Sequence, residues 1–217
     1  MELKGKKVFF LGDSITEGHG TSCEEKCYVS VFGALSGAEV KNYGIGGTRI
    51  ARQREKSEEE KFDQDFVKRA DEMEEGADAV VVFGGTNDFG HGDAAIGDFD
   101  SRDVYTFYGA MHVLCEKLLK KYPQARIVFL TPLHRLSEDD FVDDWGHKKE
   151  KNLAGYVEIL KEVAAYYGLP VLDLFRESGL QPKVDIIREI YMPDGLHPSD
   201  EGAQRVAERI YGFLKAL

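Results

Sequence analysis

The chain of 217 residues is 42% hydrophobic and 31% charged, a balance typical of a globular protein and unlike that of a disordered, collagen-like or coiled-coil chain. Its 28 basic and 39 acidic residues give a net charge of −11, which repels phosphate backbones and anionic lipid. We therefore expect neither nucleic acid nor a membrane surface as a partner.

The cysteines Cys23, Cys27 and Cys115 suggest neither a disulfide framework nor a metal site. Cys23 and Cys27 are spaced more widely than a C-x-x-C motif, and no second Cys or His pair completes a ligand set. Free thiols are typical of a reducing compartment. The apolar run 8–11 is too short for the core of a signal peptide, and no apolar run is long enough to span a membrane. We expect a cytoplasmic protein.

Short apolar runs alternate with longer amphipathic ones, a pattern typical of βαβ units around a parallel sheet. The sequence predicts strands, in chain order, at residues 8–11, 39–43, 79–83, 126–131 and 170–173. The first, third and fourth are apolar almost throughout, as expected for strands buried on both faces. The second and fifth are shorter or more polar, so we place them at the edges of the sheet.

Longer segments at residues 104–121, 150–167 and 200–215 carry apolar side chains at spacings of three and four. This period predicts amphipathic helices whose apolar faces pack on the sheet. The charge run at residues 52–61 is typical of a solvated loop and the start of a helix. No repeat, low-complexity tract or long linker interrupts the pattern, so we expect a single domain over residues 1–217.

Glycines and small polar residues follow the first three predicted strands and precede the last predicted helix. These segments are residues 12–18, 44–49, 84–90 and 193–198. Ligands of an open parallel sheet bind at the carboxyl ends of its strands. Taken singly, each segment is also a common turn or helix cap. Arg49 stands where a dinucleotide fingerprint needs glycine, and no P-loop motif occurs.

Together, these segments contain every group that acyl transfer by a serine needs. Ser14 supplies a hydroxyl nucleophile, His197 can take its proton, and Asp194 can accept the other imidazole N–H. The backbone N–H groups of Ser14 and Gly47 and the side-chain amide of Asn87 can donate to one developing oxyanion. Asp194 and His197 also fit an ion pair, a helix cap with a chance neighbour, or two metal ligands.

The four segments resemble, in order, the sequence blocks of the SGNH (GDSL) hydrolase family. Residues 12–14 (Gly-Asp-Ser) match the nucleophile block, 42–47 the oxyanion-glycine block, 85–88 the Gly-x-Asn-Asp block and 194–198 the Asp-x-x-His-Pro block. Ile15 and Thr16 depart from the literal Gly-Asp-Ser-Leu, a common variation in this family. The matches extend from residue 12 to residue 198, almost the whole chain.

The resemblance implies a three-layer α/β/α, flavodoxin-like domain with a five-stranded parallel sheet, the SGNH hydrolase fold. It implies Ser14, Asp194 and His197 as the catalytic residues, and Ser14, Gly47 and Asn87 as the oxyanion hole. The expected ligand is a small-molecule ester, and no cofactor or metal is expected.

Within this family we expect a serine esterase that forms an acyl-enzyme and prefers short-chain or carbohydrate O-acetyl esters. A lipase-like acylhydrolase, acting on lysophospholipids or acyl thioesters, is the main alternative. The G-x-S-x-G elbow of the α/β-hydrolases is absent. Less favoured are a binding module and a metal-dependent phosphoesterase, the latter built on Asp13, Asn87, Asp88, Asp194 and His197.

Further side chains are candidates for the walls of a substrate pocket. His91 and His134 follow the third and fourth predicted strands, and Phe89 and Trp145 are candidate apolar walls. Residues 134–147 are expected to form a long loop over the site. His112 lies in a helical segment, where we expect a structural or solvent-facing role.

Overall fold

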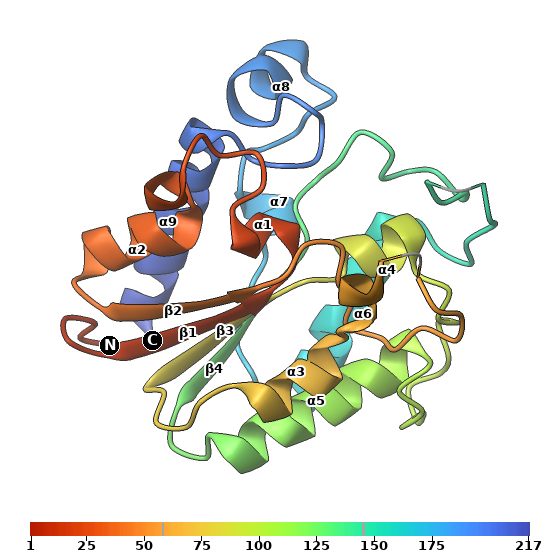
Figure 1. Cartoon of the computed structure of the whole chain (residues 1–217), viewed down its shortest axis with the longest axis horizontal. Helices are drawn as coiled ribbons and strands as arrows, with labels where there is room; N and C mark the ends of the chain where they lie inside the picture. The colour runs from red at the N-terminus through yellow and green to blue at the C-terminus, as the bar shows by residue number, and fades with distance from the viewer. Residues whose placement is uncertain (58, 145) are drawn as a thin grey trace.

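A five-stranded, all-parallel sheet forms the centre of the molecule, which is represented by a computed structural model describing residues 1–57, 59–144 and 146–217. The strand order is β2-β1-β3-β4-β5 (Figure 1). The strands are β1 (Lys7–Gly12), β2 (Glu39–Gly44), β3 (Ala79–Phe83), β4 (Arg126–Leu130) and β5 (Val171–Leu172). This order is the flavodoxin-like one. The predicted α/β fold, with the second and fifth strands at the edges, is confirmed.

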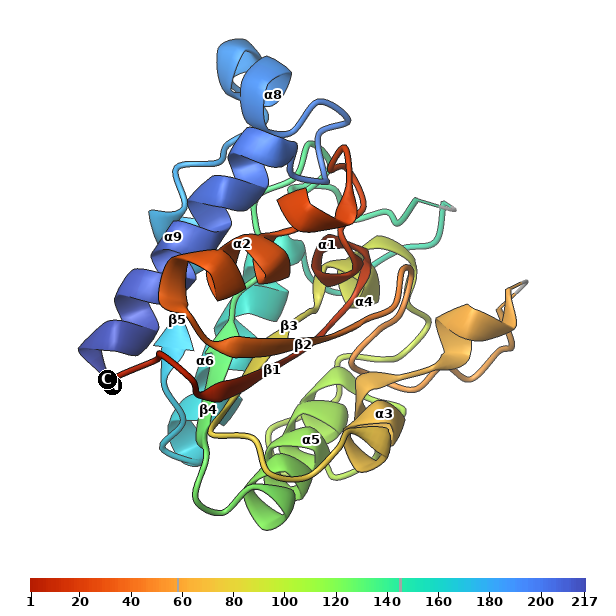
Figure 2. The same cartoon turned by 60° about the vertical axis from the view of Figure 1, so that its left-hand side comes forward.

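Helices cover both faces of the sheet and make a three-layer α/β/α arrangement (Figures 1 and 2). One face carries α2 (Tyr28–Ser36) and α9 (Asp200–Ala216), and the other carries α3 (Phe66–Glu72), α5 (Phe107–Lys121) and α6 (Leu153–Tyr166). The connections contain the short helices α1 (Ser14–Glu17), α4 (Thr86–His91), α7 (Leu174–Glu177) and α8 (Asp185–Tyr191), and 3₁₀ turns at Glu24–Lys26 and Glu60–Asp63.

Successive side chains of the central strands enter opposite cores, because neighbouring residues of a strand point to opposite faces. In β1, Phe9 and Leu11 pack in the core with α3, α5 and α6, whereas Val8 and Phe10 pack in the core with α2 and α9. Every residue of β3 is buried. Burial on both faces explains why these strands are apolar throughout rather than alternating.

Side-chain caps set where the predicted helices begin. Thr106, Asn152 and Ser199 each accept a hydrogen bond from the backbone N–H three residues on. The helices expected from residues 104 and 150 therefore start at Phe107 and Leu153.

The sequence pattern does not predict α2 or α3. The segment of α2 (YVSVFGALS) contains β-branched residues and a glycine, which favour the helix poorly, and its stability comes from packing against α9. The described residues of the charge run 52–61 form a loop that leads into the 3₁₀ turn Glu60–Asp63, and the next α-helix begins only at Phe66. There Asp65 caps α3 by accepting from the Lys68 N–H at 2.8 Å.

The parallel register aligns the carboxyl ends of the central strands. Gly12 at the end of β1 is level with Gly44 of β2 on one side and with Phe83 of β3 on the other. The segments that follow these strands therefore start side by side at one edge of the sheet, where ligands of open parallel sheets bind.

Candidate active site

Ser14 is the first residue of α1, directly after the turn that leaves β1. The carboxylate of Asp13 accepts a hydrogen bond from the Ile15 N–H at 3.0 Å and caps this short helix. Gly12 has no room for a side chain, because a Cβ there would overlap Thr16. The tight turn fixes the backbone around the serine and places its hydroxyl at the carboxyl edge of the sheet.

The hydroxyl of Ser14 lies 2.9 Å from Nε2 of His197, a residue 183 positions later in the chain. Nδ1 of the same ring lies 2.6 Å from Oδ2 of Asp194. The other carboxylate oxygen of Asp194 accepts from the backbone N–H of Leu196 at 2.9 Å and of His197 at 2.7 Å. Because an ionised carboxylate only accepts, the ring proton sits on Nδ1, and Nε2 is left to accept from the serine.

Burial and hydrogen bonding act in opposite directions on the two ionisable partners. Burial lowers the pKa of His197 below its usual value, and the neighbouring Asp194 only partly restores it. For Asp194, burial alone would raise the pKa, but the hydrogen bonds from the His197 ring and from two backbone N–H groups lower it overall. Near neutral pH the pair is therefore a neutral imidazole beside an ionised carboxylate, the state that a general base requires.

The imidazole of His197 is held from the side by the loop after α1, a contact that the sequence motifs did not reveal. The ring of His19 meets it edge to face, with centroids 4.4 Å apart. Gly20, at φ +95°, lies so close that a Cβ there would come within 2.8 Å of the His197 Cβ. Only glycine fits both this left-handed backbone and this approach.

The glycine segment after β2 lies beside the serine. A Cβ on Gly46 would lie 3.7 Å from the Ser14 Cβ, and the Gly46 N–H donates to the Glu17 carboxylate at 2.9 Å. Gly47 has a φ of +75°, and a Cβ there would overlap the ring of Phe62. Glycine is thus required at residue 47 by the backbone and by the space around it.

The segment after β3 is bonded to the same glycine segment. The side-chain amide of Asn87 donates to the Thr48 carbonyl at 3.0 Å. The buried carboxylate of Asp88 accepts from the N–H groups of Ile50 at 2.9 Å and Ala51 at 2.8 Å. Burial raises the pKa of Asp88 to about 6, although these two N–H groups oppose the shift.

A buried arginine in α3 connects these segments and was missed by sequence reasoning. Arg69 donates to the carbonyl oxygens of Gly12 at 2.9 Å and Tyr43 at 2.6 Å, and to the Thr48 hydroxyl at 2.7 Å. These groups belong to the end of β1, the end of β2 and the glycine segment. The planar guanidinium, with donors in fixed directions, can bind all of them at once.

Comparison with known proteins finds one matching family. The sequence pattern of the GDSL-like lipase/acylhydrolase family matches residues 10–205. The chain belongs to this family. The recognition made from the four sequence blocks is confirmed, and the protein is a member of a hydrolase family. Among curated proteins, none matches the chain.

Solved structures share the fold of this GDSL-like hydrolase over nearly its full length. One is 36% identical, with 100% of this chain and 99% of the other covered and a TM-score of 0.86. A protein from Lactobacillus plantarum is 28% identical, with 99% and 98% covered and a TM-score of 0.81. The lipase/acylhydrolase from Enterococcus faecalis is 22% identical, with 97% and 96% covered and a TM-score of 0.65, which shows a common fold.

Two candidate wall residues of this GDSL-like hydrolase, Phe89 and His134, and the helical His112 lie in different surroundings. Phe89 is 1% exposed and packs in the core against Tyr156, so the expectation of a pocket wall is wrong for it. The ring of His134 lies over Phe175, with centroids 3.9 Å apart, and its Nδ1 lies 2.6 Å from a Glu138 carboxylate oxygen. His112 is buried and bonds to a tyrosine hydroxyl, a structural role.

His91 lines a pocket at the end of α4, and Trp145 lies outside the described residues. The described part of the segment 134–147 is a loop. It touches the segment that carries Asp194 and His197, because the Leu136 N–H donates to the Gly195 carbonyl at 3.0 Å.

The described residues contain no group of three or more His, Cys, Asp or Glu side chains placed to hold a metal ion. Asp13 and Asp88, two members of the candidate metal set, instead direct carboxylate oxygens at backbone N–H groups. In the same part of the chain, no helix combines the length and apolar character that crossing a membrane requires.

Proposed function

We propose that this hydrolase is a serine carboxylesterase whose catalytic residues are Ser14, His197 and Asp194. The observation that carries the proposal is the continuous chain of contacts, 2.9 Å from Ser14 Oγ to His197 Nε2 and 2.6 Å from His197 Nδ1 to Asp194. Nucleophile, base and orienting carboxylate are then in hydrogen-bond reach of one another, as nucleophilic catalysis requires.

The reaction has two steps. In the first, His197 accepts the Ser14 proton as Oγ bonds to the ester carbonyl carbon. The tetrahedral intermediate then collapses, its bond to the alcohol oxygen breaks, and the imidazolium gives its proton to the departing alcohol. In the second, His197 takes a proton from water, which attacks the acyl-enzyme, and the acid leaves as Ser14 regains its proton.

We assign the oxyanion hole to the backbone N–H groups of Ser14 and Gly47 and the side-chain amide of Asn87. Asn87 uses one of its two amide hydrogens on the Thr48 carbonyl, so the second can serve the substrate. The position of Gly46 beside Ser14 and the hydrogen bond from Asn87 to Thr48 support this assignment, because they place both donor segments near the nucleophile. Donors held in advance stabilise the developing charge without reorganisation.

We propose short-chain or carbohydrate O-acetyl esters as the substrates, one domain over residues 1–217 as the unit of activity, and the cytoplasm as its compartment. Cys23, Cys27 and Cys115 are free thiols in the structure, which supports a reducing compartment. The lipase-like alternative predicts a preference for acyl chains of eight carbons or longer. A series of p-nitrophenyl esters of increasing chain length distinguishes the two.

Covalent labelling tests the nucleophile. A fluorophosphonate should add one mass increment to the wild-type protein by reacting with Ser14, and none to Ser14→Ala. His197→Gln should remain unlabelled over the same period, because the serine then lacks its base. Labelling of Ser14→Ala to the wild-type extent would refute the assignment.

A further inference from the structure

The short helix α4, which carries Asn87, depends on its surroundings for its position. It has six residues, and its N-cap, Gly85, makes no side-chain cap hydrogen bond. So short a helix is not stable on its own in water, and contacts with the rest of the chain must hold it. The direction of the Asn87 amide is therefore set by the side chains that contact α4.

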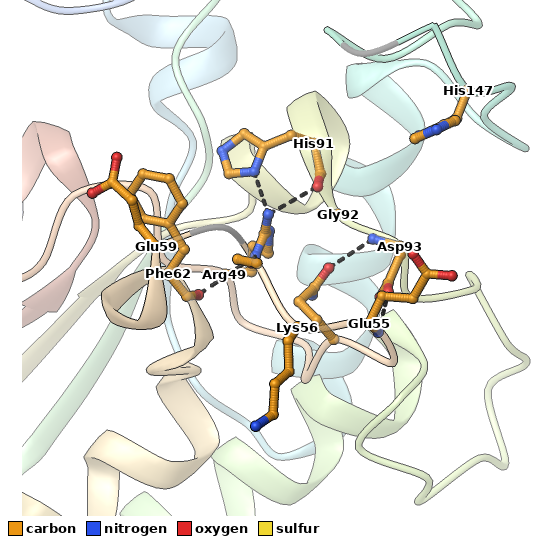
Figure 3. Close-up of a pocket in the computed structure, with 11 residues that line it drawn as sticks. Arg49, Glu55, Lys56, Glu59, Phe62, His91, Gly92, Asp93 and His147 are labelled. Atoms are coloured by element: carbon orange, nitrogen blue, oxygen red, sulfur yellow. Dashed lines mark hydrogen bonds between the residues drawn. The ribbon is translucent and has the colours of Figure 1, made fainter.

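Two buried arginines contact this helix, and the first is Arg49. Its guanidinium donates to His91 Nδ1 at 2.6 Å and to the His91 carbonyl at 3.0 Å, beside a pocket of about 330 Å³ (Figure 3). In the middle of the helix, Asp88 accepts from the N–H groups of Ile50 and Ala51. The middle and the end of α4 are thus bonded to the glycine segment and to the residues that follow it.

The second arginine is Arg135, in the loop after β4, and its side chain is only 6% exposed. Its guanidinium carbon lies 5.4 Å from the centroid of the Phe89 ring, and its Nη1 donates to the Thr86 carbonyl at 3.4 Å. A Cβ on Gly90 would come within 2.5 Å of the same nitrogen. The guanidinium therefore contacts the residue before Asn87 and two of the three residues after it.

Arg135 is itself held in place by the loop that carries it. Its Nη2 donates to both carboxylate oxygens of Asp144, at 2.9 and 3.1 Å, and its Nε donates to the Ser137 hydroxyl at 3.0 Å. The next residue, Leu136, is bonded to Gly195 in the segment of the proposed base. Because the Arg135 side chain is almost entirely buried, it is placed to hold α4 rather than to bind a substrate.

We propose that Arg135 is a positioning residue of the esterase, which fixes α4 so that the Asn87 amide stays directed at the oxyanion. A donor stabilises the developing charge best when it is held in place before the reaction. A displacement of about 1 Å can cost about 100-fold in rate. This inference rests on the proposed function and deepens it, since it names a residue that acts through the proposed oxyanion hole.

The first test is Arg135→Lys, which keeps the positive charge but lacks the planar group that reaches three partners at once. With p-nitrophenyl acetate, kcat per fluorophosphonate-reactive site should fall at least about tenfold while KM changes less than about twofold, because the amide acts in the transition state. Arg126→Lys makes the same substitution at the exposed start of β4 and should keep the wild-type kcat. A wild-type kcat in Arg135→Lys would overturn the proposal.

A double-mutant cycle with Asn87→Ala separates positioning of the amide from a general loss of structure. If Arg135 acts through Asn87, its replacement by lysine should cost less than about threefold in kcat once the amide is absent. An equal cost with and without the amide would overturn the proposal, because the effect would then not pass through Asn87.

Asp144→Ala decides the question if Arg135→Lys does not fold. The Asp144 side chain is 43% exposed, and its backbone N–H keeps the hydrogen bond to the Gly90 carbonyl. Loss of this carboxylate releases one end of the guanidinium, so kcat should fall at least about threefold when Asn87 is present and remain unchanged when it is absent. A wild-type kcat in Asp144→Ala, or an equal loss in both backgrounds, would count against the positioning role.

Failure of this inference is distinguishable from failure of the esterase proposal. If the esterase proposal fails, hydrolysis persists in Ser14→Ala. If only the positioning role fails, hydrolysis depends on Ser14, whereas the Arg135 and Asp144 variants keep the wild-type kcat or lose the same factor with and without Asn87.

Discussion

Gly20 lies directly against His197: a methyl group on its Cα would come within 2.8 Å of the His197 Cβ and 2.7 Å of the Pro198 carbonyl oxygen. The contact joins the loop after α1, which follows the proposed nucleophile, to the segment that carries the proposed base. The position of the imidazole therefore depends on a residue 177 positions away, as well as on Asp194.

Gly20→Ala should lower kcat/KM by about 100-fold, because a displacement of about 1 Å at a catalytic group has effects of that size. The matched control is Gly5→Ala. Gly5 has a similar left-handed backbone, at φ +72°, but nothing lies within 4 Å of an added Cβ. Both variants should lose about 1 to 2 kcal/mol of stability from the unfavourable backbone conformation. Wild-type kinetics in Gly20→Ala would show that the contact does not position His197.

Arg69 should be required for the stability of the site. Arg69→Leu leaves the buried carbonyl groups of Gly12 and Tyr43 without these donors, so the free energy of unfolding should fall by about 3 kcal/mol or more. Arg69→Lys should recover only part of this loss, since a single ammonium lacks the planar fork. Urea denaturation measures both. An Arg69→Lys variant as stable as wild type would contradict the geometric argument.

The pH dependence of kcat/KM should report His197. Its pKa is lowered by burial, and the base is active when deprotonated, so activity should fall only as the pH drops below the usual histidine value of about 6.5. A wild-type acid limb centred above 6.5 would be inconsistent with the buried imidazole.

In Asp194→Asn, kcat should drop about 10⁴-fold, because the proton that orients the ring loses its acceptor.

Asp13 should make the protein less stable as the pH rises. Burial raises its pKa to about 7, against 3.8 normally, and the Ile15 N–H and the Arg69 charge only partly oppose this. Between these two values the folded state keeps a proton that the unfolded state releases, so the Asp13 contribution to stability declines from about pH 4 to pH 7. Asp13→Asn, which keeps the acceptor for Ile15, should remove that part of the slope. Thermal unfolding of both proteins across this range provides the measurement, and identical slopes would count against it.

The strands were predictable because each central one is buried on both faces, which leaves an apolar run in the sequence. Likewise α9 was predictable from its apolar stripe. The sequence pattern did not reveal α2, whose residues pack well against α9 but have low helix propensity. Its helical state is set by tertiary contacts that no local window contains.

The same distinction applies to the site. Ser14, His197 and Asp194 stand in short motifs, and the structure brings their side chains within hydrogen-bond distance of one another. Gly20 and Arg69 act through partners far along the chain, so no local motif marks them. The charge run at residues 52–61 predicted only a solvated loop. Several of its residues also form one wall of a pocket, but the other wall includes the end of α4, so the run by itself could not reveal the pocket.

The most direct test of the account is p-nitrophenyl acetate hydrolysis by wild-type protein and Ser14→Ala, with EDTA in both assays. We predict activity that survives EDTA and falls at least about 1000-fold in the variant, with the fold unchanged by circular dichroism. Equal activity in the two proteins would contradict serine acyl transfer and return Ser14 to the role of a turn residue.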